Sequence, residues 1–393
     1  MRPTEIDLLD VSLFTERREQ AAFRLLRDEA PVYLHPEPSG PGFYALTRYE
    51  HVSQVLRDTQ KFSSAQGTQI VDRRAEGHGH PSVHNSDPPL HTHLRNVAIA
   101  GLRKKVAEDM EDRIRQVVRT LFNAAPTGEP FDFVEQVALP LPMIVIADLL
   151  GVPEVDQRRM VVWANTMSDS HASAEVQGAA RHELFEYFRT LVRLKRSEPA
   201  DDLATLLATA RLDGELLTDG QLDAYFMVLT VAGNETTRFL VSGGLEQLCR
   251  QPEEFARLRG NQQLIPLAVE EMVRWVTPVM QMRRTVTEDC EIDGVEIRRG
   301  AKVVPYFASA NRDERQFANP DRFLIDRQPN PHLGFGQGAH FCMGAHIARA
   351  EARIFFEEYF ARYKHCELQQ LGERLPSYWF AGLSRLVVEW HAH

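Results

Sequence analysis

Residues 335–344 read Phe335-Gly336-Gln337-Gly338-Ala339-His340-Phe341-Cys342-Met343-Gly344, and the rest of the chain is interpreted from this stretch outward. Four small residues surround one cysteine, and glycine permits positive φ and close backbone approach. The loop can therefore wrap a flat group and present the sulfur of Cys342 to it. An apolar helical pattern follows at once, and the start of a helix favours a thiolate. Such a thiolate suits an iron ligand; the alternative is a free cysteine buried in a glycine-rich turn.

The composition is that of a globular protein, since 43% of the 393 residues are hydrophobic and 25% are charged. The net charge of −10 argues against a nucleic-acid-binding surface. The first residues are charged and lack the apolar core of a secretory signal. The longest apolar stretch, 139–152, holds two prolines and Asp148 and is too short to span a bilayer. We therefore expect a soluble, cytoplasmic protein without a membrane anchor.

The hydrophobic pattern predicts a mixed N-terminal segment followed by a mainly helical chain. Helices are expected at 16–30, 49–57, 105–124, 139–150, 154–170, 178–196, 217–250, 265–275 and 343–363. Strands are expected at 32–35, 43–46, 284–297, 302–307 and 385–390, with a hairpin turn at Asp293-Gly294. The β-rich parts then cover about 31–47, 284–307 and 366–393.

Residues 58–90 form a long, weakly patterned loop, and such loops are usually functional or mobile. Five of the fifteen histidines fall within sixteen residues in and just beyond it: His78, His80, His84, His91 and His93. One interpretation is a metal site, and the other is a solvated loop followed by unrelated residues of the next helix. The second is favoured, because no carboxylate or cysteine stands at an obvious ligand spacing.

The longest helical candidate runs from Leu217 to Arg250, and residues 225–233 are apolar on nearly every face. Its middle, Ala232-Gly233-Asn234-Glu235-Thr236-Thr237, is a poor choice for a buried helix interior. Residues that are unfavourable inside a buried helix, within a pattern that otherwise predicts one, suggest a functional role. Either Thr236 bonds back to the preceding turn and Glu235 finds a salt bridge, or a bend opens a groove for dioxygen. In the second case Thr236 would hold the oxygen, and Glu235 would relay protons to it.

Several motifs in this chain resemble signatures of the cytochrome P450 superfamily. They are Asp87-Pro-Pro-x-His-x-x-x-Arg95, Ala232-Gly-x-Glu-Thr236, Glu271-x-x-Arg274, Pro320-x-Arg-Phe323 and the cysteine stretch Phe335–Gly344. Their order matches the family, and the resemblance covers essentially the whole chain. It implies a single domain over 1–393 with a mainly α fold and a small β-rich region. The haem would lie between the long central helix and the cysteine loop.

The resemblance also implies a role for each matching residue. Cys342 is the axial ligand of the iron of haem b, and Thr236 and Glu235 form the acid–alcohol pair that delivers protons. Glu271, Arg274 and Arg322 form a buried ion-pair scaffold that holds the cysteine loop. The remaining haem-binding residues are His91, Arg95, Ala232, Arg284, Phe335, Gly336, His340 and Gly344, with Arg283 as the alternative to Arg284.

The implied reaction is the insertion of one oxygen atom of O2 into a C–H bond of a hydrophobic small molecule. No flavin or iron–sulfur motif is visible, so a ferredoxin with its reductase is expected to supply electrons to a monomer. An acidic ferredoxin is expected to dock on basic residues: Arg103, Lys104, Lys105, Arg349 and Arg353. The alternatives are a peroxide-driven haem enzyme, which would lack the acid–alcohol pair, and a haem-binding sensor without turnover.

The substrate pocket is expected, by position in the family, to be lined mainly by apolar residues. They are Val228, Val231, Val279, Met280, Gln281 and Phe380. The runs Val231–Arg238 and Ser309–Glu314 most resemble bacterial members that hydroxylate terpenoids, sterols or branched lipids. Small aromatic or hydrocarbon substrates are the alternative.

Overall fold

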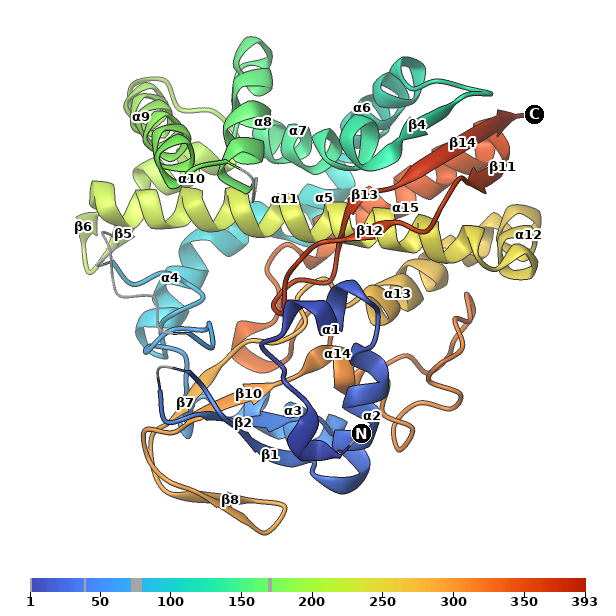
Figure 1. Cartoon of the computed structure of the whole chain (residues 1–393). Coiled ribbons are helices and arrows are strands. Elements are labelled where there is room, and N and C mark those ends of the chain that lie inside the picture. Colours follow the sequence, from blue (N-terminus) through green and yellow to red (C-terminus); the bar gives the residue numbers. More distant parts are fainter. Residues whose placement is uncertain (1, 39, 72–79, 169–171) are drawn as a thin grey trace.

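The computed structural model describes residues 2–38, 40–71, 80–168 and 172–393 (Figure 1). Its helices are α1 (Val11–Thr15), α2 (Glu19–Glu29), α3 (Tyr49–Arg57), α4 (Leu90–Ile99), α5 (Lys104–Asp109), α6 (Glu111–Ala124), α7 (Pro140–Leu149), α8 (Glu154–Ser168), α9 (Ala174–Ser197), α10 (Leu203–Thr209), α11 (Asp219–Cys249), α12 (Pro252–Gly260), α13 (Ile265–Val276), α14 (Phe307–Ala310) and α15 (Ala345–Arg362). Short 3-10 or π segments are η1 (Pro3–Glu5), η2 (Ala100–Leu102), η3 (Val134–Ala138), η4 (Gln262–Leu264) and η5 (Gly338–His340).

The strands are β1 (Val32–His35), β2 (Phe43–Leu46), β3 (Phe62–Ser63), β4 (Pro130–Asp132), β5 (Arg211–Leu212), β6 (Glu215–Leu216), β7 (Arg284–Val286), β8 (Cys290–Ile292), β9 (Val295–Ile297), β10 (Lys302–Pro305), β11 (Tyr363–Leu368), β12 (Glu373–Arg374), β13 (Leu383–Arg385) and β14 (Val387–Ala392). The mainly α fold with small sheets is thereby confirmed. No helix in the described ranges is long and apolar enough to cross a membrane.

Most of the predicted helices and strands are present, but two of them are each divided into shorter elements. The helix predicted at 105–124 is two helices, α5 and α6, and the strand predicted at 284–297 is β7 followed by the hairpin β8–β9. Asp293 and Gly294 turn that hairpin with φ of 51° and 76°, as the two-residue turn requires. Helix α7 begins at Pro140, because the fixed φ of proline suits a first helical turn.

The N-terminal sheet has five strands in the order β1-β2-β10-β7-β3 and lies at the bottom of Figure 1. Strand β10 runs parallel to β2, and the other neighbours are antiparallel. This order brings residues near 43 and near 303 together, so the two β-rich parts of the sequence form one sheet.

Helix α11 crosses the middle of the molecule (Figure 1) and packs against α7, α13 and α15. Thr218 and Gln221 cap its start with reciprocal hydrogen bonds. The helix continues without a break through residues 232–237. Gly233 allows close packing there, because a Cβ at this position would lie 2.5 Å from Cδ1 of Ile146 on α7 and would displace that side chain.

The C-terminal sheet joins β11, β14 and β4 in that order, all antiparallel. Trp390 on β14 is fully buried, and its ring centroid lies 5.0 Å from Phe122 and 4.9 Å from Phe131. One face of this sheet therefore anchors the end of the chain in the main core, and the opposite face is turned to solvent.

Candidate functional site

The cysteine loop is shaped by its own backbone. The N–H of Cys342 donates to the carbonyl of Phe335 at 2.9 Å, and the N–H of Phe341 donates to that of Gly338 at 3.1 Å. Gly336 and Gly338 have φ of 69° and 72°, in the left-handed region that favours glycine. The loop thus folds back on itself and places the sulfur just ahead of α15.

The sulfur of Cys342 lines an internal cavity, so it is accessible from that space although protein atoms surround it. Burial raises the pKa of the Cys342 thiol. The N–H of Gly344, together with the positive charges of Arg95 and Arg349, opposes this rise by stabilising the thiolate. The backbone N–H is the contact expected for a loop that presents sulfur to a metal.

A Gly338→Ala substitution is expected to disrupt the loop and lower the haem content of the purified protein severalfold. The added Cβ would lie 2.5 Å from the carbonyl oxygen of Leu56, on a residue whose φ is +72°. Gly128→Ala is the matched control, since its φ of +75° is similar, it lies outside the cavity lining, and no described protein atom lies within 4 Å of its added Cβ. Haem content per chain, measured for both variants, checks the prediction; equal losses would contradict it.

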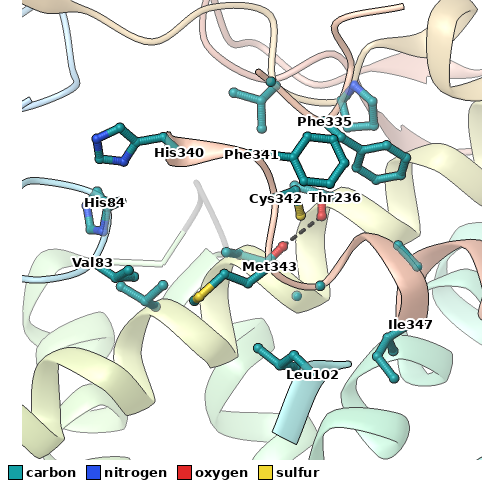
Figure 2. A pocket seen from close by; sticks show the side chains of 18 of the residues that line it. Val83, His84, Leu102, Thr236, Phe335, His340, Phe341, Cys342, Met343 and Ile347 are labelled. Atoms are coloured by element: carbon teal, nitrogen blue, oxygen red, sulfur yellow. Dashed lines mark hydrogen bonds between the residues drawn. The ribbon is translucent and has the colours of Figure 1, made fainter. Parts of the chain in front are cut away.

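A cavity of about 270 Å³ lies between α11 and the cysteine loop. Figure 2 shows Cys342 and Thr236 at this cavity, with His84 and His340 to one side. The α11 residues on its wall recur every three or four positions, as one face of a helix does. They are Val228, Leu229, Ala232, Gly233, Thr236, Thr237 and Leu240. From the other elements, Val279, Met282, Phe335 and Ile347 add apolar wall.

The helical period explains one error in the predicted pocket. Val231 lies off the face of α11 that lines the cavity, because at 3.6 residues per turn it is about 140° around the helix from Thr236, which is near the centre of that face. Val228, Ala232 and Val279 do line the cavity, as predicted, whereas Val231 is not among its described lining residues.

The packing of the strand-like segment 279–282 and of its neighbours corrects three further pocket predictions. Met280 packs into the core beside the N-terminal helices, and Gln281 is bridged to Tyr306. Phe380 is bridged to Val279 and packs against Phe239, with ring centroids 5.8 Å apart. None of these three lines the cavity within the described ranges, and Met282, which was not predicted, does.

Several hydrogen-bonding and cationic side chains converge on one end of the cavity. His91 is 1% exposed, and neither of its ring nitrogens has a partner within the described part of the chain. Its ring centroid lies 4.1 Å from that of His340. Burial, followed by the charge of Arg284, lowers the pKa of His340 to about 3. Arg95 and Arg284 also line the cavity.

The structure distinguishes the two adjacent arginines. Arg283 donates to the carbonyls of Gln66 and Gln69 and to the hydroxyl of Thr285. Arg284 lines the cavity, and burial lowers its pKa to about 10 because an unneutralised guanidinium is costly there. Of the two arginines, Arg284 is therefore the one that faces the cavity, and no ion pair of its guanidinium is found among the described residues.

The described histidines of the histidine-rich stretch lie in different environments. His84 and His91 line the cavity, His93 is exposed, and the ring of His80 packs beside Gly220. His78 lies outside the described residues. No metal-ligand cluster is found among the described residues of this stretch.

His84 is a cavity residue that the motifs did not single out. The Ser82 hydroxyl donates to Oδ1 of Asn85 at 2.7 Å and lies 2.8 Å from Nδ1 of His84. Since the hydroxyl proton is used by Asn85, the Ser82 oxygen accepts from Nδ1–H of His84. Nε2 of the neutral ring is then an acceptor for which no partner is found among the described residues. Only the folded loop brings it to the cavity, so no sequence signal beyond the histidine itself was available.

Thr236 donates to the carbonyl of Ala232 at 2.7 Å, which is the back-bonded arrangement (Figure 2). Glu235 is 8% exposed, and no hydrogen bond or ion pair to it is found in the described ranges. The nearby Arg238 is also 8% exposed. The salt bridge considered for Glu235 is thus not formed, and its carboxyl is left beside a threonine that faces the cavity.

The ion-pair scaffold contains a different arginine from the one predicted. Glu271 and Arg274 are fully buried and joined by two hydrogen bonds of 2.7 Å. The second arginine on Glu271 is Arg327, whose Nε lies 3.0 and 3.1 Å from the two carboxylate oxygens. Arg322 is exposed and contributes only its carbonyl oxygen, which accepts from Arg274 and Arg327. The turn after Pro320 points the Arg322 side chain to solvent, so this prediction was wrong.

Two of the basic residues expected to bind a redox partner are engaged in ion pairs. Arg349 donates to both oxygens of Glu270 at 2.6 and 2.8 Å and lies 4.4 Å from the ring of Phe335. Burial would raise the pKa of Glu270, but hydrogen bonds from Arg349 and His332 outweigh it and lower this pKa to about 2. Arg353 pairs with Glu111 and Glu357. These arginines hold the cysteine loop and α15 in place.

The residues around the cavity fit haem b. A haem presents an iron atom to one ligand and two propionate carboxylates at one edge. Here the sulfur of Cys342 is available for the iron. His91, whose ring nitrogens have no partner among the described residues, lies with Arg95, Arg284 and His340 where carboxylates would be bound. The apolar walls supplied by α11 and the cysteine loop match the faces of the macrocycle.

Comparison with known proteins agrees with the fit of the cavity to haem. The Cytochrome P450 family model matches residues 159–385. The methyl-branched lipid omega-hydroxylase of Mycobacterium tuberculosis is 35% identical, over 99% of this chain and 96% of its own length. The linalool 8-monooxygenase of Pseudomonas putida is 35% identical, over 97% of this chain and 98% of its own. The structure of Mycobacterium marinum cytochrome P450 CYP268A2 in complex with pseudoionone matches at a TM-score of 0.91, with 34% identity and 98% of each chain covered.

The family model covers more than half of the chain, and both relatives align along nearly their whole length. The chain therefore belongs to the cytochrome P450 family and is a haem-thiolate monooxygenase, with haem b as cofactor and O2 as co-substrate.

Proposed function

We propose that Cys342 binds the haem iron and that His91, Arg95, Arg284 and His340 bind the propionates. The haem supplies the oxidising chemistry by which one atom of O2 enters a C–H bond. The ring nitrogens of His91 support this assignment, since they have no partner in the described part of the chain and buried polar groups normally have one. Phe335, Gly336, Gly344 and Ala232 form the surfaces against which the macrocycle packs.

Thr236 and Glu235 are proposed to move protons to dioxygen in the cavity. The hydroxyl of Thr236 is held by Ala232 and can rotate to donate into the cavity, which its helix face lines. The carboxyl of Glu235 lies one residue before it and has no ion pair within the described residues to hold it in place. A hydroxyl in the cavity and an untethered carboxyl behind it are the parts of a short proton relay.

The proposed substrate is a branched, acyclic terpenoid. The observation that carries this proposal is the apolar lining of the cavity next to Thr236, supplied by Val228, Leu229, Val279 and Met282. Such a wall offers packing to a flexible hydrocarbon and few directional contacts. Linalool and pseudoionone, which appear in the names of one relative and one similar structure, are both branched acyclic isoprenoids.

Titration of the ferric protein with linalool, a methyl-branched fatty acid, a steroid and a small aromatic tests this proposal. A shift of the Soret band to the high-spin position reports a ligand that displaces water from the iron. We expect the largest shift with linalool. A shift with the steroid or the aromatic alone, in protein shown to hold thiolate-ligated haem, would exclude the terpenoid assignment.

An acidic ferredoxin with its reductase is proposed as the electron donor. Arg103 is exposed, and no ion-pair partner is found for it among the described residues, whereas Lys104 and Lys105 pair with Glu108 and Asp109 on their own helix. Such exposed lysine pairs are weak and leave the cations available to a partner.

Arg103→Glu is expected to slow reduction of the haem by ferredoxin about tenfold at low salt, with the difference shrinking as salt rises. Stopped-flow reduction at several ionic strengths measures this. Lys364→Glu, an exposed substitution on β11, is the control for charge alone. Equal slowing in both variants, or no slowing in either, would contradict docking at Arg103.

A further inference from the structure

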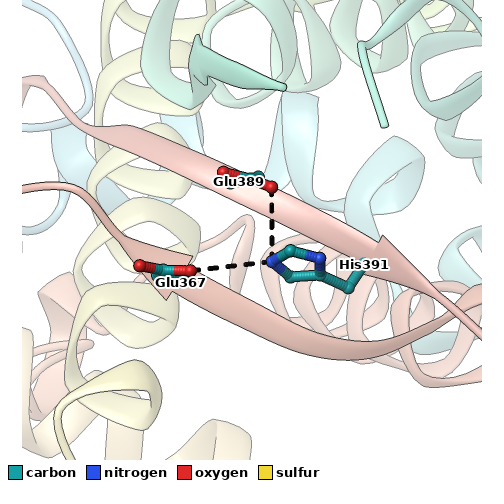
Figure 3. A group of neighbouring side chains, drawn as sticks. All are labelled: Glu367, Glu389 and His391. Carbon is teal, nitrogen blue, oxygen red and sulfur yellow. Dashed lines mark ion pairs between the residues drawn. The ribbon is translucent and has the colours of Figure 1, made fainter. Parts of the chain in front are cut away.

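A second group of ligand-type side chains lies outside the haem cavity, on the solvent face of the C-terminal hairpin. Strand register places Glu367 on β11 directly opposite Glu389 on β14, and His365 directly opposite His391. Residues two apart on a strand share a face, so all four side chains lie on one side of the sheet. Figure 3 shows the imidazole of His391 between the carboxylates of Glu367 and Glu389.

Two carboxylates on this face share one ion-pair partner among the described residues. The ion-pair partner found for both Glu367 and Glu389 in the described ranges is His391, which is charged only when protonated. Like charges directly opposite on antiparallel strands destabilise the pair. A cation between the carboxylates would remove that repulsion.

The donor atoms are spaced as a small tetrahedral ion requires. Nε2 of His391 lies 3.8 Å from Oε2 of Glu367 and 3.6 Å from Oε1 of Glu389, and the three ligand atoms lie within 4.8 Å of one another. Ligands about 2.1 Å from a tetrahedral zinc are about 3.4 Å apart. Two of the three separations are thus within a few tenths of an ångström of the bound geometry.

We propose that Glu367, Glu389 and His391 bind a divalent cation of the zinc class, with water in the fourth position. Imidazole favours zinc over magnesium or calcium, and two carboxylates neutralise its charge. The ring of His365, whose centroid lies 5.7 Å from that of His391 at 25° between planes, restricts the orientation of His391 over the carboxylates. None of these three residues lines the haem cavity, where the reaction with dioxygen takes place.

The bound ion would join β11 to β14 next to Trp390. Glu389 and His391 flank this tryptophan, whose ring fills the core between β14 and Phe122. Metal binding is therefore expected to stabilise the native hairpin and raise the melting temperature with zinc concentration, because an ion that binds only the folded state stabilises it.

Equilibrium dialysis of the haem-loaded protein against Zn²⁺, with metal content measured by elemental analysis, tests the proposal. Glu367→Gln is the main variant, because its side chain is 58% exposed and the substitution keeps its shape, so we expect the fold to be retained. We expect this variant and His391→Ala to lower zinc affinity at least tenfold, since even loss of a supporting contact costs roughly 10- to 100-fold. His393→Ala is the control, because its ring bonds the carbonyl of Phe360 instead.

One zinc per chain, lost in Glu367→Gln and retained in His393→Ala, would support the site. Zinc-dependent melting that follows the same pattern would support its role in the hairpin. Zinc binding equal in all variants, or no zinc bound by the unaltered protein, would overturn the proposal.

Discussion

Replacing Arg327 with alanine is expected to destabilise the protein by about 3–5 kcal/mol, because it breaks a buried charge network. Arg327 is 7% exposed and bonds both oxygens of Glu271, which is itself fully buried. It also donates to the carbonyls of Ala318 and Asn319 in the segment before the cysteine loop. Its removal leaves one charge and three carbonyl oxygens, including that of Arg322, without this partner. Denaturant unfolding of the haem-loaded protein and haem content per chain measure the loss.

Arg322→Ala is the matched control for that experiment. Arg322 is exposed and takes part through its carbonyl oxygen, which alanine retains. The change in unfolding free energy is expected to stay within about 0.5 kcal/mol, as for other surface substitutions. If Arg322→Ala were as damaging as Arg327→Ala, the scaffold described above would be wrong and the motif-based assignment would be restored.

Thr236→Ala and Glu235→Gln are each expected to lower product formation about a hundredfold or more, the usual contribution of a positioned proton donor. Consumption of reduced nicotinamide should fall much less, and hydrogen peroxide should accumulate, because oxygen is reduced without being inserted into substrate. The ratio of product formed to nicotinamide consumed is the measurement, with substrate present at saturation.

Two variants separate proton delivery from general damage to α11. Thr236→Ser retains the hydroxyl and should recover most of the coupling between consumption and product. Thr230→Val removes a buried hydroxyl on the same helix, away from the described lining of the cavity, and should stay fully coupled. Uncoupling by Thr230→Val to the same extent would show that helix integrity, rather than proton transfer, sets the ratio.

The sequence alone determined the elements and motifs whose signals are local. Strands β1 and β2 and helix α3 have the predicted bounds, because alternating or helical apolar patterns and turn residues lie within a few positions. The position of Cys342 ahead of a helix follows in the same way from glycines and an apolar run. The family could be recognised from such short motifs before any packing was known.

Only the tertiary structure decided which side chains meet. Arg327, rather than Arg322, reaches Glu271 because the irregular segment after Pro320 turns one arginine inward and the other outward. Met282 rather than Met280 lines the cavity, and His84 joins it from a loop without a pattern. The pairing of Glu367 with Glu389 and His391 depends on strand register. These contacts join residues far apart in the chain, and side-chain direction there is set by packing and register, which local sequence patterns do not encode.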